Sequence, residues 1–254
     1  MCLLLISCRT HPKYPMVLAA NRDEFHARPS SVAGFWEDEP FVLAGRDLQA
    51  GGTWLGITKE GRIAAVTNYH EATAINSSLL SRGALVSDFL RRDIEPRSYA
   101  DLLADNGKWY GGFNIVFGTM GDLYYCSNRS EGYEPLEPGI HGLSNRVLND
   151  DAFKVRKGRE SMKDILAKES VSADDLFSLL DDRDQEPGPE ISSQIGMEED
   201  RFYSPIFVAG KEYGTRCSTV ILIDKEGHVF FSERGFSSEG EQTETVEYEF
   251  RVGD

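Results

Sequence analysis

Short apolar runs separated by polar corners dominate the first seventy residues. Residues 2–8 and 15–20 are nearly continuous hydrophobic stretches, and prolines at 12 and 15 mark the link between them. Runs of this length bounded by turn residues are typical of strands, so we expect a hairpin whose second strand ends just before Asn21. The same pattern predicts three further strands over residues 41–45, 53–58 and 62–69.

The spacing of the hydrophobic positions becomes helical in the middle of the chain. Residues 79–92 place their apolar side chains on one broad stripe, which predicts an amphipathic helix, and a shorter helix is expected at 98–105. Two more helices are predicted over 150–168, with Asp150 or Asp151 as N-cap, and over 172–182, with Ser172 as N-cap. A predicted hairpin, 114–119 and 123–126, lies between the helical blocks.

The last seventy residues combine an irregular segment with a return to strands. Residues 183–214 contain three prolines and an acidic run, and we expect a long irregular loop. An acidic run of this kind is usually solvated surface, and the alternative is a loop that covers a substrate. Residues 217–223 and 228–232 predict an apolar hairpin, and the alternation at 246–251 predicts a strand with one buried face. Strands in two blocks, with helices between them, favour an α+β fold in one domain spanning 1–254.

Charge excludes some classes of partner. The chain has 254 residues, and 27 basic against 42 acidic side chains give a net charge of −15. A nucleic-acid binder needs clustered lysines and arginines, so we expect no nucleic-acid partner. No apolar run approaches the length of a membrane span, so no integral membrane contact is expected either.

Cysteine usage bears on the compartment and on metal binding. The four cysteines, at positions 2, 8, 126 and 217, show no CxxC spacing, and the five histidines show no HxH or HxxxH spacing. We therefore expect no metal site, and scattered thiols in an acidic chain indicate the reducing cytosol. The apolar stretch at residues 3–6 is too short for a signal peptide and has no basic segment before it.

Cys2 is the first candidate for chemistry. If Met1 is removed, one residue carries both a thiol and a free α-amine, whose ordinary pKa of about 8 lets it accept the thiol proton. Nucleophile and base then arrive together without a histidine. The alternative is that Cys2 is a small apolar residue at the start of a buried strand.

Several motifs together resemble one family. The chain opens with MCLLLI, continues with LAANRDEFHARP and GGTWLG, and later carries GTRCST at 214–219. This series resembles the NRDE-motif family, which includes the transport and Golgi organisation protein 2 homologues. That family in turn is similar to the N-terminal nucleophile hydrolases, near the choloylglycine-hydrolase and penicillin-acylase branch. The resemblance implies a four-layer αββα sandwich in which a processed cysteine begins a central strand.

The resemblance also implies a set of site residues. By position, Cys2 matches the nucleophile, Asp23 the group that holds the α-amine, and Arg216 a late arginine of the site. Asn68 and Asn145 match the asparagines that stabilise the oxyanion, although each also ends an apolar run and could be a turn residue. Substrate-binding candidates are Arg22, Asn21, Trp54, which could wall a cavity, and His70, which would point the same way as Asn68 on a strand.

The expected function is therefore hydrolysis of a linear amide or related acyl bond, without a cofactor. The expected partner is a small acyl, lipid-like or tetrapyrrole molecule bound in a pocket over Cys2. The alternative, also implied by the resemblance, is a non-catalytic carrier of haem or acyl lipid, because a sandwich can keep its pocket and lose its chemistry.

Overall fold

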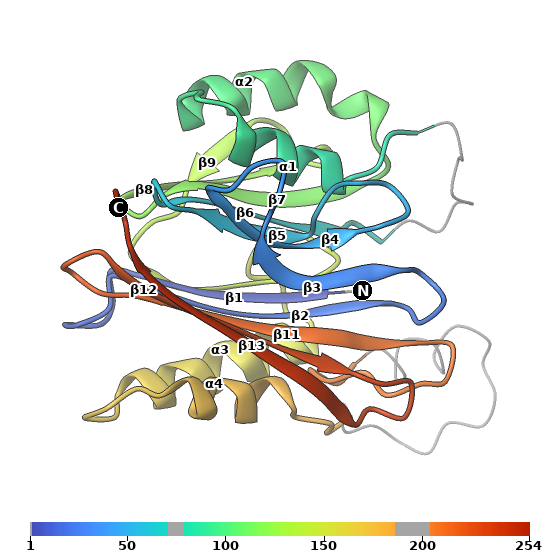
Figure 1. Cartoon of the computed structure of the whole chain (residues 1–254), viewed down its shortest axis with the longest axis vertical. Coiled ribbons are helices and arrows are strands. Elements are labelled where there is room, and N and C mark those ends of the chain that lie inside the picture. Colours follow the sequence, from blue (N-terminus) through green and yellow to red (C-terminus); the bar gives the residue numbers. More distant parts are fainter. Residues whose placement is uncertain (1, 71–78, 186–203) are drawn as a thin grey trace.

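Two antiparallel sheets form the centre of the protein (Figure 1). The structure is a computed structural model that describes residues 2–70, 79–185 and 204–254. In this part of the chain the first sheet has the strand order β10-β1-β2-β11-β12-β13. Its strands are β1 (Cys2–Cys8), β2 (Met16–Phe25), β10 (Gly139–Leu143), β11 (Tyr213–Ile223), β12 (His228–Phe236) and β13 (Gln242–Arg251). The hairpins predicted for β1–β2 and β11–β12 are confirmed.

The second sheet follows chain order from β3 to β9. Its strands are β3 (Ser30–Phe35), β4 (Val42–Asp47), β5 (Leu55–Thr58), β6 (Arg62–Asn68), β7 (Phe113–Thr119), β8 (Asp122–Ser127) and β9 (Tyr133–Pro135). Side chains from both sheets, among them Leu4, Leu18, Ile57 and Val116, form one hydrophobic core between them. Successive side chains of a strand point to opposite faces of the sheet, so two residues that are two positions apart on β1 or β2 lie on the same face.

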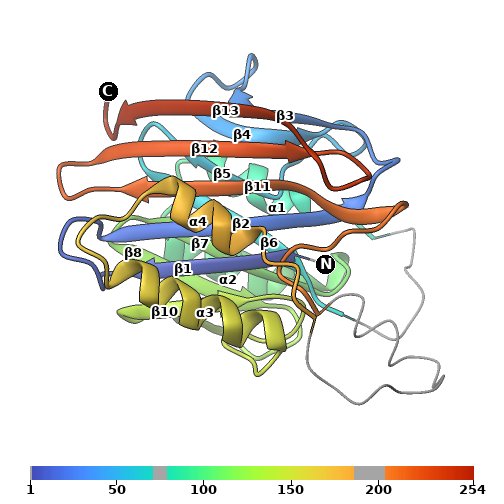
Figure 2. The same cartoon turned by 90° about the horizontal axis from the view of Figure 1, so that it is seen from below.

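Helices cover the outer face of each sheet (Figures 1 and 2). Helices α1 (Gly83–Arg91) and α2 (Pro96–Asn106), followed by the short 3-10 turn η1 (Gly107–Trp109), pack on the second sheet through a core that includes Phe89 and Phe117. Helices α3 (Phe153–Leu166) and α4 (Ala173–Leu180) pack on the first sheet around Leu3, Val17 and Leu176. The result is the expected αββα arrangement of layers.

Several boundaries differ from the sequence prediction. Strand β2 continues to Phe25, because its polar residues pair with β11 instead of ending the strand. Helix α3 begins after Ala152, so neither Asp150 nor Asp151 is its N-cap, whereas Ser172 caps α4 in a capping box with Asp175 as predicted. Strands β3, β9 and β10 were not predicted, because their sequences lack a regular alternation of apolar residues.

The predicted loop over 183–214 needs correction at its end. Tyr213 and Gly214 belong to β11, and residues 204–208 are buried. Residues 186–203 lie outside the described part, so the covering role of this segment, like the single domain over 1–254, stays a prediction. In the described part of the chain, no helix is both long and apolar enough to cross a membrane.

Candidate active site

Cys2 begins β1 and lies in a row of three side chains across the first sheet. Arg22 on β2 is directly opposite Cys2, and Cys217 on β11 is directly opposite Arg22. Residues directly opposite in antiparallel strands lie on the same face and contact each other. This face is the one between the sheets, because Leu4 and Leu18, which share it, belong to the core there. Cys2 itself is half-buried.

The NRDE segment is split between two layers. Asn21 and Asp23 point toward the helices, where Asn21 bonds to Leu180 of α4 and Asp23 contacts Lys154 of α3. Arg22 points the other way, and its guanidinium carbon lies 4.2 Å from the centroid of the Trp54 ring, next to the second sheet. The expectation that these residues lie beyond the strand end is therefore wrong. They alternate within β2, which separates Arg22 from Asp23.

Asp23 is buried beside the start of β1. Its side chain is 0% exposed, and its Oδ2 lies 3.7 Å from the Lys154 Nζ. The Thr215 hydroxyl donates a hydrogen bond of 2.8 Å to its Oδ1. Burial raises the pKa of the Asp23 carboxyl, and the Lys154 charge and the Thr215 hydrogen bond oppose that rise. The carboxylate is thus held by groups from α3 and β11.

The Cys2 thiol is linked electrostatically to both neighbours on β2. Burial raises its pKa, and the negative charge of Asp23 raises it further. A hydrogen bond from the Asp23 backbone N–H to the sulfur, and the positive charge of Arg22, lower the pKa. Because burial dominates, the thiol needs a base to remove its proton.

A hydrogen-bond chain joins Cys2 to the two candidate asparagines. The Ser144 hydroxyl can donate its single hydrogen either to the Cys2 carbonyl oxygen at 2.9 Å or to the Asn145 Oδ1 at 3.0 Å. The Asn145 amide nitrogen donates a 2.8 Å hydrogen bond to the Asn68 carbonyl oxygen. Asn145 is buried, whereas Asn68 is exposed at the end of β6. The structure therefore brings Cys2, Asn68 and Asn145 together at one end of the two sheets.

The remaining candidates take different places. The Asn21 amide donates to the carbonyls of Leu180 and Ile206 and accepts from Ser218, so its hydrogen bonds are made within the protein. Arg216 lies in a bulge of β11 and donates to the carbonyls of Phe25, His26 and Arg28, which holds the turn after β2. Burial and the nearby charge of Arg22 lower the pKa of Arg216. His70 is exposed, and its backbone N–H donates to the Asn145 carbonyl.

A small cavity lies between the sheets next to Cys2. Its volume is about 20 Å³, which is room for one water molecule but not for an acyl chain. Its walls include Cys2, Arg22, Trp54, Thr67 and Thr219. A cavity of this size is not the substrate pocket predicted over Cys2, and that pocket stays a prediction.

Three residues near Cys2 were not identified from the sequence. Thr215 lies inside the GTRCST segment and Ser144 directly precedes Asn145, but a lone hydroxyl in a turn or strand gives no further signal. Lys154 did carry a signal, because it precedes Gly158 and Met162 at helical spacing on the buried stripe of α3. A lysine at such a position is seldom buried without an acidic partner.

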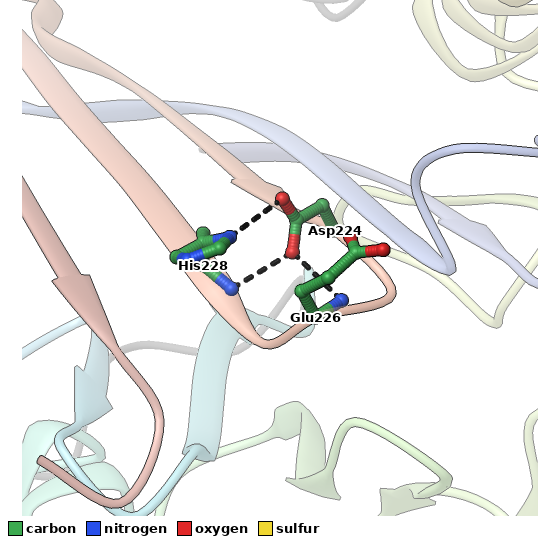
Figure 3. A group of neighbouring side chains, drawn as sticks. All are labelled: Asp224, Glu226 and His228. Carbon is green, nitrogen blue, oxygen red and sulfur yellow. Dashed lines mark hydrogen bonds and ion pairs between the residues drawn. The ribbon is translucent and has the colours of Figure 1, made fainter.

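One trio of metal-ligand types lies elsewhere in the described residues. Asp224, Glu226 and His228 have ligand atoms within 4.8 Å of one another in the turn between β11 and β12 (Figure 3). Asp224 accepts hydrogen bonds from the backbone N–H groups of Glu226 and His228, and its Oδ2 lies 3.0 Å from the His228 Nδ1. The arrangement closes the turn. The trio is about 20 Å along β11 from the site around Cys2, beside a groove of about 700 Å³.

Two stacked sheets with helices on both outer faces define a four-layer αββα sandwich, and Cys2 begins an interior strand of one of these sheets. Two solved structures share this fold: an N-acylethanolamine-hydrolyzing acid amidase ortholog from Caenorhabditis elegans (TM-score 0.51, 10% identity, 87% of this chain and 92% of that one), and the C2A mutant of the conjugated bile acid hydrolase from Clostridium perfringens (TM-score 0.50, 7% identity, 99% and 98%).

The chain belongs to the Transport and Golgi organisation 2 family, because the model of that family matches residues 1–238. It is 38% identical to the Transport and Golgi organization protein 2 homolog of Bos taurus, over 99% of both chains. It is 35% identical to the homolog of Homo sapiens, again over 99% of both. The similarity to the family predicted from the NRDE segment is thus confirmed.

Proposed function

We propose that this protein is a cysteine N-terminal nucleophile hydrolase that cleaves a linear amide or a related acyl bond. One observation carries the proposal: Cys2 begins an interior strand with Asp23 beside it, and hydrogen bonds through Ser144 lead to Asn145 and Asn68. The names of two proteins with this fold, an acid amidase and a bile acid hydrolase, agree with the reaction class. Removal of Met1 is part of the proposal.

The first half of the reaction transfers an acyl group to Cys2. The α-amine of Cys2 takes the thiol proton, and the sulfur forms a bond to the substrate carbonyl carbon while an electron pair moves to the carbonyl oxygen. Asn68 and Asn145 stabilise this oxyanion. Loss of one such donor costs roughly 10²–10³ in rate. The carbon–nitrogen bond then breaks, the ammonium returns its proton to the leaving nitrogen, and a thioester remains.

The second half releases the acyl group. The α-amine takes a proton from water, and the hydroxide adds to the thioester carbonyl. The carbon–sulfur bond breaks, the sulfur recovers the proton from the ammonium, and a carboxylic acid leaves. Asp23 orients the amine in both halves, and Arg22, with Trp54 under it, and Arg216 supply positive charge for a substrate carboxylate. No metal or cofactor takes part in these steps.

The second candidate function is a carrier. The family name refers to transport and Golgi organisation, and a carrier of haem or acyl lipid would keep the site without turnover. The proposed compartment for either function is the cytosol, since all four cysteines are free thiols.

The test combines intact mass with a thiol-reactive amide probe. Untagged protein should lack Met1, and the probe should label Cys2, lose that label in Cys2→Ala and react much more slowly in Asn68→Ala. Cys8→Ala, at the far end of the same strand, is the matched control and should label normally. Retention of Met1 in all molecules, or equal labelling of all four cysteines in the folded protein, would refute the hydrolase and favour the carrier.

A further inference from the structure

A lysine is buried behind the start of β1. Lys154, in the first turn of α3, has a side chain that is 5% exposed. Its Nζ is buried and has no hydrogen-bond acceptor among the described residues. The Asp23 Oδ2, at 3.7 Å, is its partner in an ion pair. Burying an ammonium group is costly unless a carboxylate compensates it, so the charges of Lys154 and Asp23 depend on each other.

Asp23 also lies where a new amino group would appear. Cys2 pairs with Arg22, so Asp23 is one residue beyond the position opposite Cys2, and its backbone N–H already bonds to the Cys2 sulfur. Once Met1 is removed, the α-amine of Cys2 is the end of the strand beside this carboxylate. One carboxylate then faces two groups that can carry a positive charge.

Ionisable groups from several elements lie near Cys2, Arg22 or Asp23. From β2 come Arg22 and Asp23, from β11 Arg216 and Cys217, and from β12 Glu233. From α3 comes Lys154, preceded by Asp150, whose Oδ1 accepts a hydrogen bond from the N–H of Ala152. Of these, Asp23 and Lys154 are joined in the ion pair beside the end of β1. Arg22 points into the layer between the sheets.

We propose that Lys154 is a positioning residue that neutralises Asp23, so that the α-amine freed at Cys2 stays in its uncharged, proton-accepting form. The inference rests on the proposed function, because it concerns the amine that removal of Met1 creates. An isolated carboxylate would bind that amine as an ammonium ion, which cannot accept the thiol proton. With Lys154 supplying the positive charge, Asp23 accepts a hydrogen bond from the neutral amine and orients its lone pair toward the sulfur.

Each group around the Asp23 carboxylate then has a separate role. Lys154 neutralises the charge, the Thr215 hydroxyl fixes Oδ1 at 2.8 Å, and the second oxygen is shared between Lys154 and the strand end. A second cation near the amine also disfavours its protonation by repulsion. Lys154 thus acts through Asp23 and does not touch the substrate.

The experiment titrates the amine without a substrate. The full chain is produced behind a leader that a protease removes, so that it begins at Cys2, and it is labelled with ¹⁵N-cysteine. Among the four cysteines only Cys2 then carries a free amine, and its ¹⁵N chemical shift is followed against pH. In Lys154→Met the ammonium-to-amine ratio at pH 7 should rise about tenfold or more, the effect of one nearby unit charge. Lys154→Arg should restore the wild-type ratio.

Two further variants make the result decisive. Lys157→Met removes a lysine of the same helix that pairs with Asp182 and Asp184, and it should leave the titration unchanged. Lys154→Met with Asp23→Asn removes both charges, so it should fold even if the single variant does not, and its ammonium-to-amine ratio at pH 7 should stay close to that of wild type. Overlapping titrations of wild type and Lys154→Met, or a ratio in the double variant that rises as much as in Lys154→Met, would overturn the inference. The titrations do not depend on turnover. An inactive protein with the expected titrations would therefore refute only the proposed function.

Discussion

Arg22 and Asp23 are neighbours in the chain, yet their side chains lie in different layers of the sandwich. Arg22 stacks on Trp54 between the two sheets, and Asp23 contacts Lys154 in the layer between the first sheet and α3. Strand alternation makes this separation unavoidable. Cys2 lies opposite Arg22, and its sulfur accepts a hydrogen bond from the Asp23 backbone N–H. It is therefore next to residues of both layers.

We expect Asn21 to contribute mainly to the stability of the fold, and less to binding. In Asn21→Ala the carbonyls of Leu180 and Ile206 and the Ser218 hydroxyl lose a buried partner, and we expect a loss of about 3 kcal/mol in the free energy of unfolding. Urea denaturation measures it. Asn106→Ala is the control, because Asn106 bonds the Leu102 carbonyl at the exposed end of α2, and it should change stability by less than about 0.5 kcal/mol. Equal effects would contradict the structural role.

The Arg22 stack on Trp54 should distinguish arginine from lysine. Arg22→Lys keeps the charge but loses the planar group that lies 4.2 Å from the ring centroid, and a desolvated stack of this kind contributes about 2 kcal/mol. We expect Arg22→Lys to lose about 1–2 kcal/mol of stability in the native background and much less when Trp54 is already leucine. Full additivity of the two changes in denaturation experiments would show that the stack contributes nothing.

Cys2 should react before the other three thiols in the folded protein. Burial raises the pKa of Cys8 and of Cys126 to about 11 each and raises that of Cys217 as well. At pH 8 about one in a thousand of the first two is ionised. Burial raises the pKa of Cys2 as well, but Cys2 is half-buried whereas the other three are buried, so reagent reaches it most easily. Iodoacetamide followed by peptide mass spectrometry should find Cys2 modified first, and all four equally in urea. Faster modification of Cys8 or Cys126 than of Cys2 would count against the assignment of the nucleophile.

The sequence predicted the strands and helices better than the site, and the four-layer arrangement came from the family resemblance. Apolar runs placed β1, β6, β7 and β11 and the four α-helices within a few residues, because their buried faces repeat regularly. It also singled out Cys2, Asn68 and Asn145, which the structure brings together. What no pattern indicated was that β2 runs on through charged residues, since this depends on partners such as Lys154 and Thr215 that lie far away in the chain.

Glu233 should make stability fall as pH rises. It is buried between the sheets, where the Ala33 N–H and the Thr219 hydroxyl donate to its carboxyl. Burial raises its pKa above the ordinary value of 4.5, so the folded protein binds this proton more tightly than the unfolded chain does. The stabilising contribution is therefore complete below about pH 4.5 and is lost as pH rises through the folded pKa. Glu233→Gln should remove that loss.

The measurement for Glu233 is urea unfolding at pH 5 and pH 8. The difference between wild type and Glu233→Gln isolates this carboxyl, because the two chains share every other titrating group. The variant should gain stability relative to wild type between the two pH values. A constant difference between the curves would mean that Glu233 does not titrate on unfolding in this range.

Gly45 tests whether Trp54 is held in place for the site. A methyl group at Gly45 would lie 2.3 Å from the Trp54 Cη2, so Gly45→Ala must displace the ring. Overpacking of this kind costs about 1–3 kcal/mol, and it should also disturb Arg22, which stacks on the ring, and so slow the labelling of Cys2. Gly121→Ala, where nothing lies within 4 Å, is the matched control and should leave both stability and labelling unchanged. If Gly45→Ala lowers stability while Cys2 reacts at its original rate, the Trp54–Arg22 stack supports the fold alone and the cavity beside Cys2 does not depend on it.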